Sequence, residues 1–228
     1  MTAAVTSDVA VVVPVYGNAP TLSALAARLA AALDGRNWRL RLVDDASPDA
    51  GLAVARRLAA AAPHIAVTAL VVNRGQHRAL LQGLADEPGA GAWVCLDADL
   101  QDPPEAVPAL LDRLAAGDVG AVFAGRRGDY QPAFRLLTGR LHRAALGRLT
   151  GLPPDAGAFV ALGPDARHAL LRLRPPSIVA GIGASGVPVA SVPVPRSVRP
   201  VGSSAWTQAA RLAQSARTLA WAAAHSHR

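Results

Sequence analysis

Short apolar runs alternate with segments of helical periodicity over the first 124 residues, and this alternation constrains the fold more than any other feature of the chain. The apolar, strand-like runs are Val9–Val15, Leu40–Val43, Ile65–Val72, Ala92–Leu96 and Val119–Ala124. The segments between them predict helices over Thr21–Leu33, Asp49–Ala62, Gly75–Ala85 and Pro104–Ala116. Such a βαβα order is typical of an α/β fold with a mostly parallel sheet and helices on both faces.

The second half of the chain is less regular. Its pattern predicts a helix over Ala133–Leu149, a strand over Ala158–Leu162, a strand over Val187–Val194, a loop over Pro195–Ser204 and a helix over Trp206–Ala224. Because Pro188 and Pro193 cannot donate to a neighbouring strand, the run that holds them is expected at a sheet edge. We expect one domain over residues 1–200 and a helical C-terminal extension over 201–228.

Composition narrows the class of protein. Half of the 228 residues are hydrophobic (51%), which is enough for a substantial core, and the chain carries a formal net charge of +7. All of its basic residues are Arg, and the excess favours anionic partners, although we expect no nucleic acid among them. The one cysteine, Cys95, lies in an apolar run and is expected to be a buried, inert thiol. No signal-peptide pattern or apolar run long enough to cross a membrane is present, so a cytoplasmic location is expected.

The stretch Leu96–Glu105 carries the strongest chemical signal, because two carboxylates, Asp97 and Asp99, directly follow a buried strand. If strand geometry persists through them, both side chains point to the same face. Gln101 adds a neutral oxygen. Hard oxygen ligands at a strand end suit Mg²⁺ or Mn²⁺, which commonly share their coordination with substrate phosphates.

Polar clusters follow three other strands, at residues 14–18, 44–49 and 73–78. Ligands bind at the carboxyl ends of strands in open α/β sheets, so these clusters are candidate binding loops. Tyr16 could pack against a nucleobase, and a carboxylate of Asp44 or Asp45 could accept a hydrogen bond from a base or a ribose. Asp49 is expected to cap the following helix. His77 is expected to orient a loop rather than to act as a catalytic base.

Together these clusters resemble glycosyltransferase family 2, which has the GT-A fold, and most closely its branch that makes polyprenyl-phosphate sugars. The matching segments are Val12–Tyr16, Leu42–Asp49, Asn73–His77 and Leu96–Glu105. Further matches follow in the family's order: Ala124–Arg126 for Gly-x-Arg, Asp155–Phe159 for Asp-x-Gly-x-Phe, and Arg199–Ser204 for a C-terminal Arg-x-x-Gly-Glu-Ser-Lys loop. The resemblance spans roughly residues 8–224, and the motifs stand in the family's order.

The resemblance implies a role for each matching position. The residues that would bind the donor nucleotide are Pro14, Tyr16, Asn18, Val43, Asp45, Ala98 and Arg199. Asp97, Asp99 and Gln101 would bind Mg²⁺ or Mn²⁺, and Arg126 and Arg140 would hold the acceptor phosphate. The implied partners are a UDP- or GDP-linked sugar and a polyprenyl phosphate at the inner face of the cell membrane. The residues expected to carry the chemistry are Asp97, Asp99, Asp155 and Arg126.

The identity of the acceptor stays open at this point. A lipid phosphate is already anionic and needs no strong base, whereas a hydroxyl acceptor would require one, for which Asp155 is the candidate. A non-catalytic nucleotide-sugar-binding or partner-binding protein is a further alternative, because Ser203 and Ala205 stand where the family usually has Glu and Lys. The segment Gly181–Gly186 matches a dinucleotide fingerprint by letter but precedes a strand-like run, so we reject NAD binding.

The C-terminal helix leaves two interpretations of membrane contact. Trp and Arg side chains on one helix are typical of a membrane-interfacial segment, but they also fit a helix that packs on the domain. A separate membrane subunit is the other way in which the chain could reach a lipid acceptor.

Overall fold

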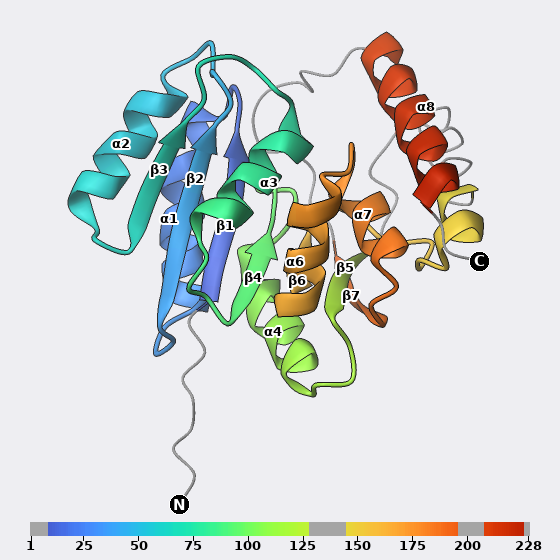
Figure 1. Cartoon of the computed structure of the whole chain (residues 1–228). Coiled ribbons are helices and arrows are strands. Elements are labelled where there is room, and N and C mark those ends of the chain that lie inside the picture. The colour runs from blue at the N-terminus through green and yellow to red at the C-terminus, as the bar shows by residue number, and fades with distance from the viewer. Residues whose placement is uncertain (1–8, 128–144, 196–207, 226–228) are drawn as a thin grey trace, which may run out of the picture.

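The computed structural model describes residues 9–127, 145–195 and 208–225 (Figure 1). Its strands are β1 (Val9–Val15), β2 (Trp38–Asp44), β3 (Ile65–Ala69), β4 (Ala92–Cys95), β5 (Ala121–Arg127), β6 (Val160–Leu162) and β7 (Val189–Pro195). Its helices are α1 (Ala19–Ala32), α2 (Gly51–Ala61), α3 (Gln76–Asp86), the 3₁₀ turn η1 (Pro104–Ala106), α4 (Val107–Ala115), α6 (Pro164–Leu173), α7 (Ile178–Ser185) and α8 (Gln208–His225).

The described strands form one mixed sheet in the order β3-β2-β1-β4-β6-β5-β7. Strands β1 to β4 are parallel to their neighbours, β6 is antiparallel to both β4 and β5, and β7 is parallel to β5. The predicted α/β class with a mostly parallel sheet is therefore confirmed. The edge position predicted for the proline-containing run is also confirmed, because β7 ends the sheet.

The sheet is covered on both faces, and each face has its own apolar core. Alternate residues of β1 serve the two cores, with Val11 and Val13 on one side and Ala10 and Val12 on the other. The first core packs under α1, α2 and α4, and the second packs under α3, α6, α7 and α8. Burial of both faces explains why β1 appears in the sequence as a continuous apolar run.

Most predicted elements are confirmed within one to three residues, and the differences have physical causes. The third strand ends at Ala69 rather than Val72, since Val71 and Val72 leave the sheet and are exposed. The helix predicted from Pro104 begins as a 3₁₀ turn and becomes α-helical at Val107. Of the helix predicted over 133–149, only residues from 145 onward lie in the described part, where 145–150 are helical.

Helices α6 and α7 were not predicted. In α7, the glycines of the dinucleotide-like segment serve close packing, because a Cβ at Gly181 would press on Pro175 and Leu170, and one at Gly183 on Thr150. The loop predicted over Pro195–Ser204 lies outside the described residues, except for Pro195 itself.

The C-terminal helix α8 packs against α7. Ala222 and Thr218 are buried there, Leu219 and Trp221 contact the second core, and Gln214 Nε2 donates to the carbonyl of Pro176 at 2.7 Å. Within the described residues, no helix is both long enough and apolar enough to cross a membrane.

Candidate active site

The loops that leave β1, β2 and β4 meet at one edge of the sheet, at the top of Figure 1. Strand β1 lies between the other two, with Pro14 opposite Val43 and Val12 opposite Cys95. Asp45 N–H donates to the carbonyl of Val15 at 2.9 Å, so the β1 and β2 loops begin side by side. The hydroxyl of Thr21, in the first turn of α1, donates to the carbonyl of Ala98 at 2.6 Å and fastens the β4 loop to the same edge.

The two carboxylates after β4 do not continue the strand. The strand ends at Cys95, so the condition under which alternation would align Asp97 with Asp99 is not met. Leu100 instead adopts a left-handed backbone conformation, with φ of 59°. Asp97 is half-buried and accepts a hydrogen bond from Gln76 Nε2 at 2.6 Å, whereas Asp99 is buried and accepts one from the Gln101 N–H at 3.0 Å. The turn, not the pleat, therefore fixes how these carboxylates are presented.

The donor atoms at this loop are oxygens. Cys95 is fully buried, and burial, together with the charge of Asp97, raises the pKa of its thiol to about 12, so it stays protonated as predicted. Within the described residues, no three His, Cys, Asp or Glu side chains gather as a ready-made metal site. A cation held by Asp97 and Asp99 would therefore complete its coordination with oxygens from elsewhere, as Mg²⁺ does with substrate phosphates.

The neighbouring carboxylates Asp44 and Asp45 have different surroundings. Both oxygens of Asp45 accept backbone hydrogen bonds at 2.7 Å, from the N–H groups of Arg74 and Gly75. Burial raises the pKa of Asp45, and these two hydrogen bonds oppose that rise. Asp45 thus anchors the loop between β3 and α3, an interaction that residue spacing does not signal.

Asp44, unlike Asp45, has one carboxylate oxygen without a hydrogen-bond partner among the described residues. It is 1% exposed, its Oδ2 accepts from the Ser47 N–H at 3.2 Å, and its Oδ1 has no hydrogen-bond partner among the described residues. A buried, unpaired carboxylate oxygen is costly, which favours a ligand group that donates to it. The sequence places Asp44 in the cluster, but the resemblance carries the nucleoside role to Asp45.

The β1 loop presents an aromatic ring. Tyr16 is 39% exposed, and its backbone N–H donates to Asn18 Oδ1 at 3.2 Å, which closes the turn into α1. Pro14 and Val43 lie in register at the base of this loop. Together with Asp44, these residues lie at the carboxyl ends of β1 and β2.

Asp49 joins the starts of two helices. Its Oδ1 accepts from the N–H of Gly51, the first residue of α2, and its Oδ2 accepts from the N–H of Ala19, the first residue of α1, both at 2.9 Å. Asp49 thus binds the first N–H of α2, but it does so from the position before the N-cap, which is Ala50 and not Asp49 as predicted.

His77 lies in the first turn of α3 and is partly buried. Its Nδ1 lies 3.5 Å from the backbone N–H of Ile178, at the start of α7. Burial lowers its pKa to about 4, so the ring is neutral near pH 7. The contact agrees with the prediction that His77 orients neighbouring structure.

Asp155 precedes β6 in the chain, and its side chain lies against Gly125 of β5. In the sheet, β6 separates β5 from β4. The Oδ2 of Asp155 accepts from Ser191 Oγ on β7 at 3.0 Å, while its Oδ1 is buried and has no partner among the described residues. Both side chains occupy the space above Gly125, where an added Cβ would collide with them. The backbone of Arg126 follows in register with Val194, whereas its side chain, Arg140 and Arg199 lie outside what the structure describes.

The family model for glycosyl transferase family 2 matches residues 10–155, more than half of the chain, and the chain belongs to that family. The chain is 41% identical over 152 residues to an undecaprenyl-phosphate 4-deoxy-4-formamido-L-arabinose transferase of Pseudomonas paraeruginosa, and 37% identical over 147 residues to one of Sodalis glossinidius. These matches cover 63% of this chain but only 43% and 44% of the two relatives, so the chain spans less than half of their length.

Solved structures confirm the GT-A-like fold. Glucosyl-3-phosphoglycerate synthase from Mycobacterium tuberculosis, in complex with Mn²⁺, UDP and phosphoglyceric acid, matches with a TM-score of 0.71 and 19% identity over 96% of this chain and 78% of that one. A mannosyltransferase from Pyrobaculum calidifontis, in complex with GDP-Man and Mn²⁺, matches with a TM-score of 0.60 and 25% identity over 87% of this chain and 58% of that one.

Proposed function

We propose that this chain is a metal-dependent, inverting glycosyltransferase that moves a sugar from a nucleoside-diphosphate sugar to a polyprenyl phosphate. The observation that carries the proposal is the meeting of the Asp97–Asp99 loop with the Tyr16 and Asp44 loops at one edge of the sheet. The names of the relatives, which are undecaprenyl-phosphate sugar transferases, support the acceptor class. We place the reaction at the inner face of the cell membrane, where a cytoplasmic protein can reach a lipid phosphate.

We assign recognition of the donor nucleotide to the loops after β1 and β2. Tyr16 offers an exposed ring face for a nucleobase, and Asp44 Oδ1 offers a buried acceptor for a base N–H or a ribose hydroxyl. Since both oxygens of Asp45 accept backbone hydrogen bonds, we assign that residue to holding the loop at residues 74–75 in place.

Asp97 and Asp99, with Gln101 beside them, would hold Mg²⁺ or Mn²⁺, and their oxygen donors fit such a cation. When bound, the cation neutralises charge on the departing nucleoside diphosphate. Gln76 would keep Asp97 oriented, and the Gln101 N–H, which follows the left-handed turn at Leu100, donates to the buried Asp99. We assign Arg126 and Arg140 to the acceptor phosphate, which they would position through charge-assisted hydrogen bonds, and Arg199 to the donor diphosphate.

A hydroxyl acceptor is the second candidate, and the surroundings of Asp155 favour it. The carboxylate has one buried oxygen without a partner among the described residues and is oriented by Ser191 through the other. Those are properties of a positioned general base. An anionic phosphate needs no such base, so the two candidates make different demands on this residue.

The test is nucleoside diphosphate release from a panel of UDP- and GDP-sugars, with undecaprenyl phosphate or a saccharide as acceptor, and with Mn²⁺ or EDTA. We expect metal-dependent release only with the lipid phosphate, and retention of most of that activity in Asp155→Asn. Release with the saccharide, abolished by Asp155→Asn, would establish the hydroxyl acceptor instead. Metal-independent release, or no donor binding at all, would contradict both assignments.

A further inference from the structure

We propose that the loop between β3 and α3, together with the adjoining cleft between α3 and α6, is a contact surface for an anionic membrane. This inference rests on the proposed function, because a polyprenyl phosphate acceptor lies in a bilayer. It goes further by naming the face of the molecule that meets the lipid.

Two exposed valines at the tip of this loop are the first observation. Val71 is 96% exposed and Val72 is 56% exposed, and they are adjacent. The other exposed large hydrophobic side chains among the described residues, Tyr16 and Leu149, are only 39% and 36% exposed. The backbone just after the tip is held firmly, since Asp45 accepts from both Arg74 N–H and Gly75 N–H. The loop therefore presents the valines at a defined place.

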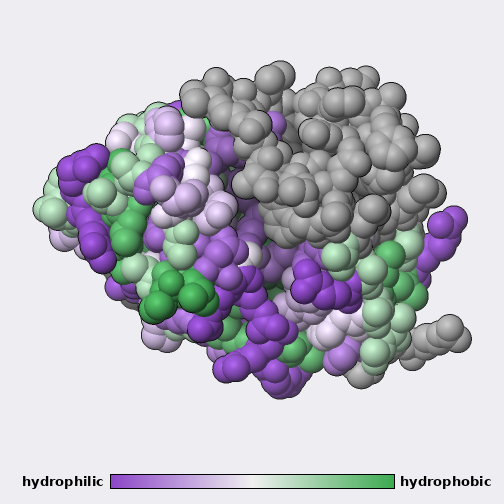
Figure 2. Space-filling model, turned by 90° about the horizontal axis from the view of Figure 1, so that it is seen from above, coloured by the Kyte–Doolittle hydropathy of each residue, from purple (hydrophilic) through white to green (hydrophobic). Residues whose placement is uncertain are grey.

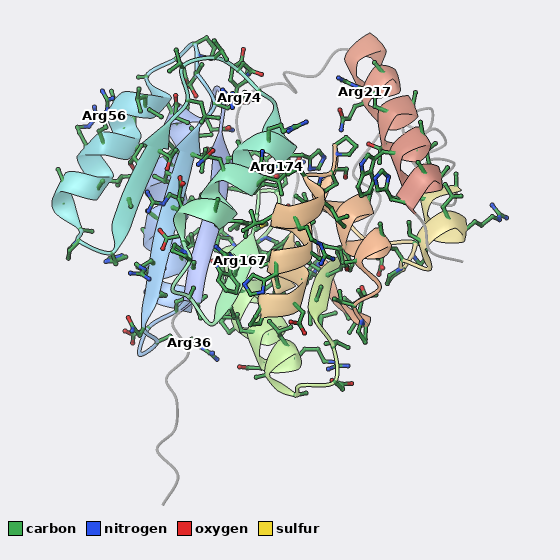
Figure 3. All side chains as sticks on the ribbon, in the orientation of Figure 1. Arg36, Arg56, Arg74, Arg167, Arg174 and Arg217 are labelled. Carbon is green, nitrogen blue, oxygen red and sulfur yellow. The ribbon has the colours of Figure 1, made fainter. Side chains whose placement is uncertain are left out.

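Three arginines surround an amphipathic cleft directly beside this tip. The cleft has a volume of about 630 Å³, its apolar lining includes Leu70, Leu81 and Leu171, and its cations are Arg74, Arg78 and Arg174. Figure 3 shows Arg74 at the top of the molecule and Arg174 below it, beside α3. Apolar walls with cationic side chains suit the boundary between phospholipid headgroups and acyl chains.

The cations of this surface are not held in salt bridges within the described part of the chain. None of its three arginines forms an ion pair there. The nearby acidic residues at the end of α3 are already engaged: Asp86 accepts from Gln82 and Thr68, and Glu87 pairs with Arg39 and Arg41. Anionic lipids are therefore the complementary partner.

The position of the surface agrees with this role. The loop leaves the same edge of the sheet as the Asp44 and Asp97 loops, so a bilayer in contact with it would lie beside the candidate active site (Figure 1). Figure 2 looks down on this edge, where hydrophobic and hydrophilic residues are intermixed. Helix α8 is a weaker candidate, because Leu219, Trp221 and Ala222 are turned into the second core.

The test is co-sedimentation of the full chain with vesicles of phosphatidylcholine, alone or mixed with phosphatidylglycerol. We expect binding that requires phosphatidylglycerol. The Arg78→Gln/Arg174→Gln double variant should weaken it roughly 25-fold, since each arginine near an anionic surface contributes about fivefold. Val71→Ser/Val72→Ser should also lose most of the binding. The matched control is Arg56→Gln/Arg57→Gln, which makes the same change of net charge at exposed sites on α2 and should bind as the unaltered chain does.

Three outcomes would overturn the proposal. An equal loss in the α2 control would mean that net charge alone drives binding. Unchanged binding in both surface variants would move the contact elsewhere, and no binding to phosphatidylglycerol vesicles would assign the surface to another partner, such as a protein. Metal-dependent nucleotide-sugar binding, measured without vesicles, separates this proposal from the proposed function. If the chain binds vesicles through these residues but binds no donor, the membrane-surface proposal stands and the transferase proposal fails.

Discussion

The side-chain amide of Gln76 donates a hydrogen bond of 2.6 Å to Asp97, and so joins the first turn of α3 to the loop after β4. The contact connects residues that are 21 positions apart in the chain. A carboxylate that is to hold a cation must keep its oxygens in one orientation, and partners behind such ligands commonly tune affinity. Gln76 is therefore a positioning residue for the candidate metal site.

Replacement of Gln76 by Leu is expected to weaken Mn²⁺-dependent donor binding about 10- to 100-fold, the usual cost of removing such a partner. Isothermal titration with the nucleoside diphosphate and Mn²⁺ measures it. Gln82→Leu, on the same helix, removes an amide whose partner is Asp86 and should leave donor binding unchanged. Equal affinities for the Gln76 variant and the unaltered chain would show that Asp97 needs no such support.

Acidification should destabilise the fold through His77. Its folded pKa of about 4 lies below the ordinary value of 6.5, so between these values the unfolded chain binds the proton more strongly. Stability that is present above pH 6.5 is therefore lost as the pH falls toward 4, by about 3 kcal/mol in all. Urea unfolding at both ends of this range, compared between the unaltered chain and His77→Gln, measures the loss.

The His77→Gln variant should show a smaller fall in stability over that range, while His168→Gln, at an exposed position on α6, should behave as the unaltered chain does. If all three proteins lose stability equally, the acid sensitivity arises from other groups.

Loss of the Asp49 carboxylate should destabilise two helices together. Asp49→Ala removes an acceptor from the first N–H of α1 and another from the first N–H of α2, at about 1 kcal/mol each. We expect a decrease of about 2 kcal/mol in the free energy of unfolding, measured with urea. Asp112→Ala, which removes an exposed ion pair with Arg36, should cost at most about 1 kcal/mol. A similar loss of unfolding free energy in both variants would argue against the two hydrogen bonds of Asp49 as the cause.

The space above Gly125 should not tolerate a methyl group. Its Cβ would collide with the side chains of Asp155 and Ser191, and overpacking of this kind costs about 1–3 kcal/mol. Thermal unfolding of Gly125→Ala measures the effect. Gly163→Ala is the control, because a Cβ there would make only ordinary contacts, 3.5 Å from the Gly120 carbonyl and 3.9 Å from Leu114. Equal melting temperatures for the two variants would contradict the crowding.

The central strands of the sheet could be predicted from sequence because they are buried. Strand β1 has the bounds that its apolar run predicts, and the carboxyl-end rule correctly places the clusters after β1, β2 and β4 at one edge. The same signal fails at Val71 and Val72, which are as apolar as the strand before them but are exposed. Helix α7 escapes prediction because its glycines serve close packing, while their low helix propensity suggests a loop.

Side-chain partners are harder to predict than elements. Asp44 and Asp45 are adjacent acidic residues, and composition cannot show that the second accepts hydrogen bonds from a loop 29 residues away while the first keeps an oxygen without a partner among the described residues. The carboxylates after β4 show the same limit, because the left-handed turn at Leu100 replaces the strand geometry on which alternation depends.

Three consecutive residues at the start of α3 bind three different parts of the molecule. Gly75 N–H donates to Asp45 after β2, Gln76 contacts Asp97 after β4, and His77 contacts the start of α7. In the proposed transferase, an altered donor preference would therefore be more easily engineered, or acquired in evolution, at the exposed β1 loop around Tyr16. Changes at residues 75–77 would disturb the anchoring of this loop on Asp45, the proposed cation site and helix packing at once.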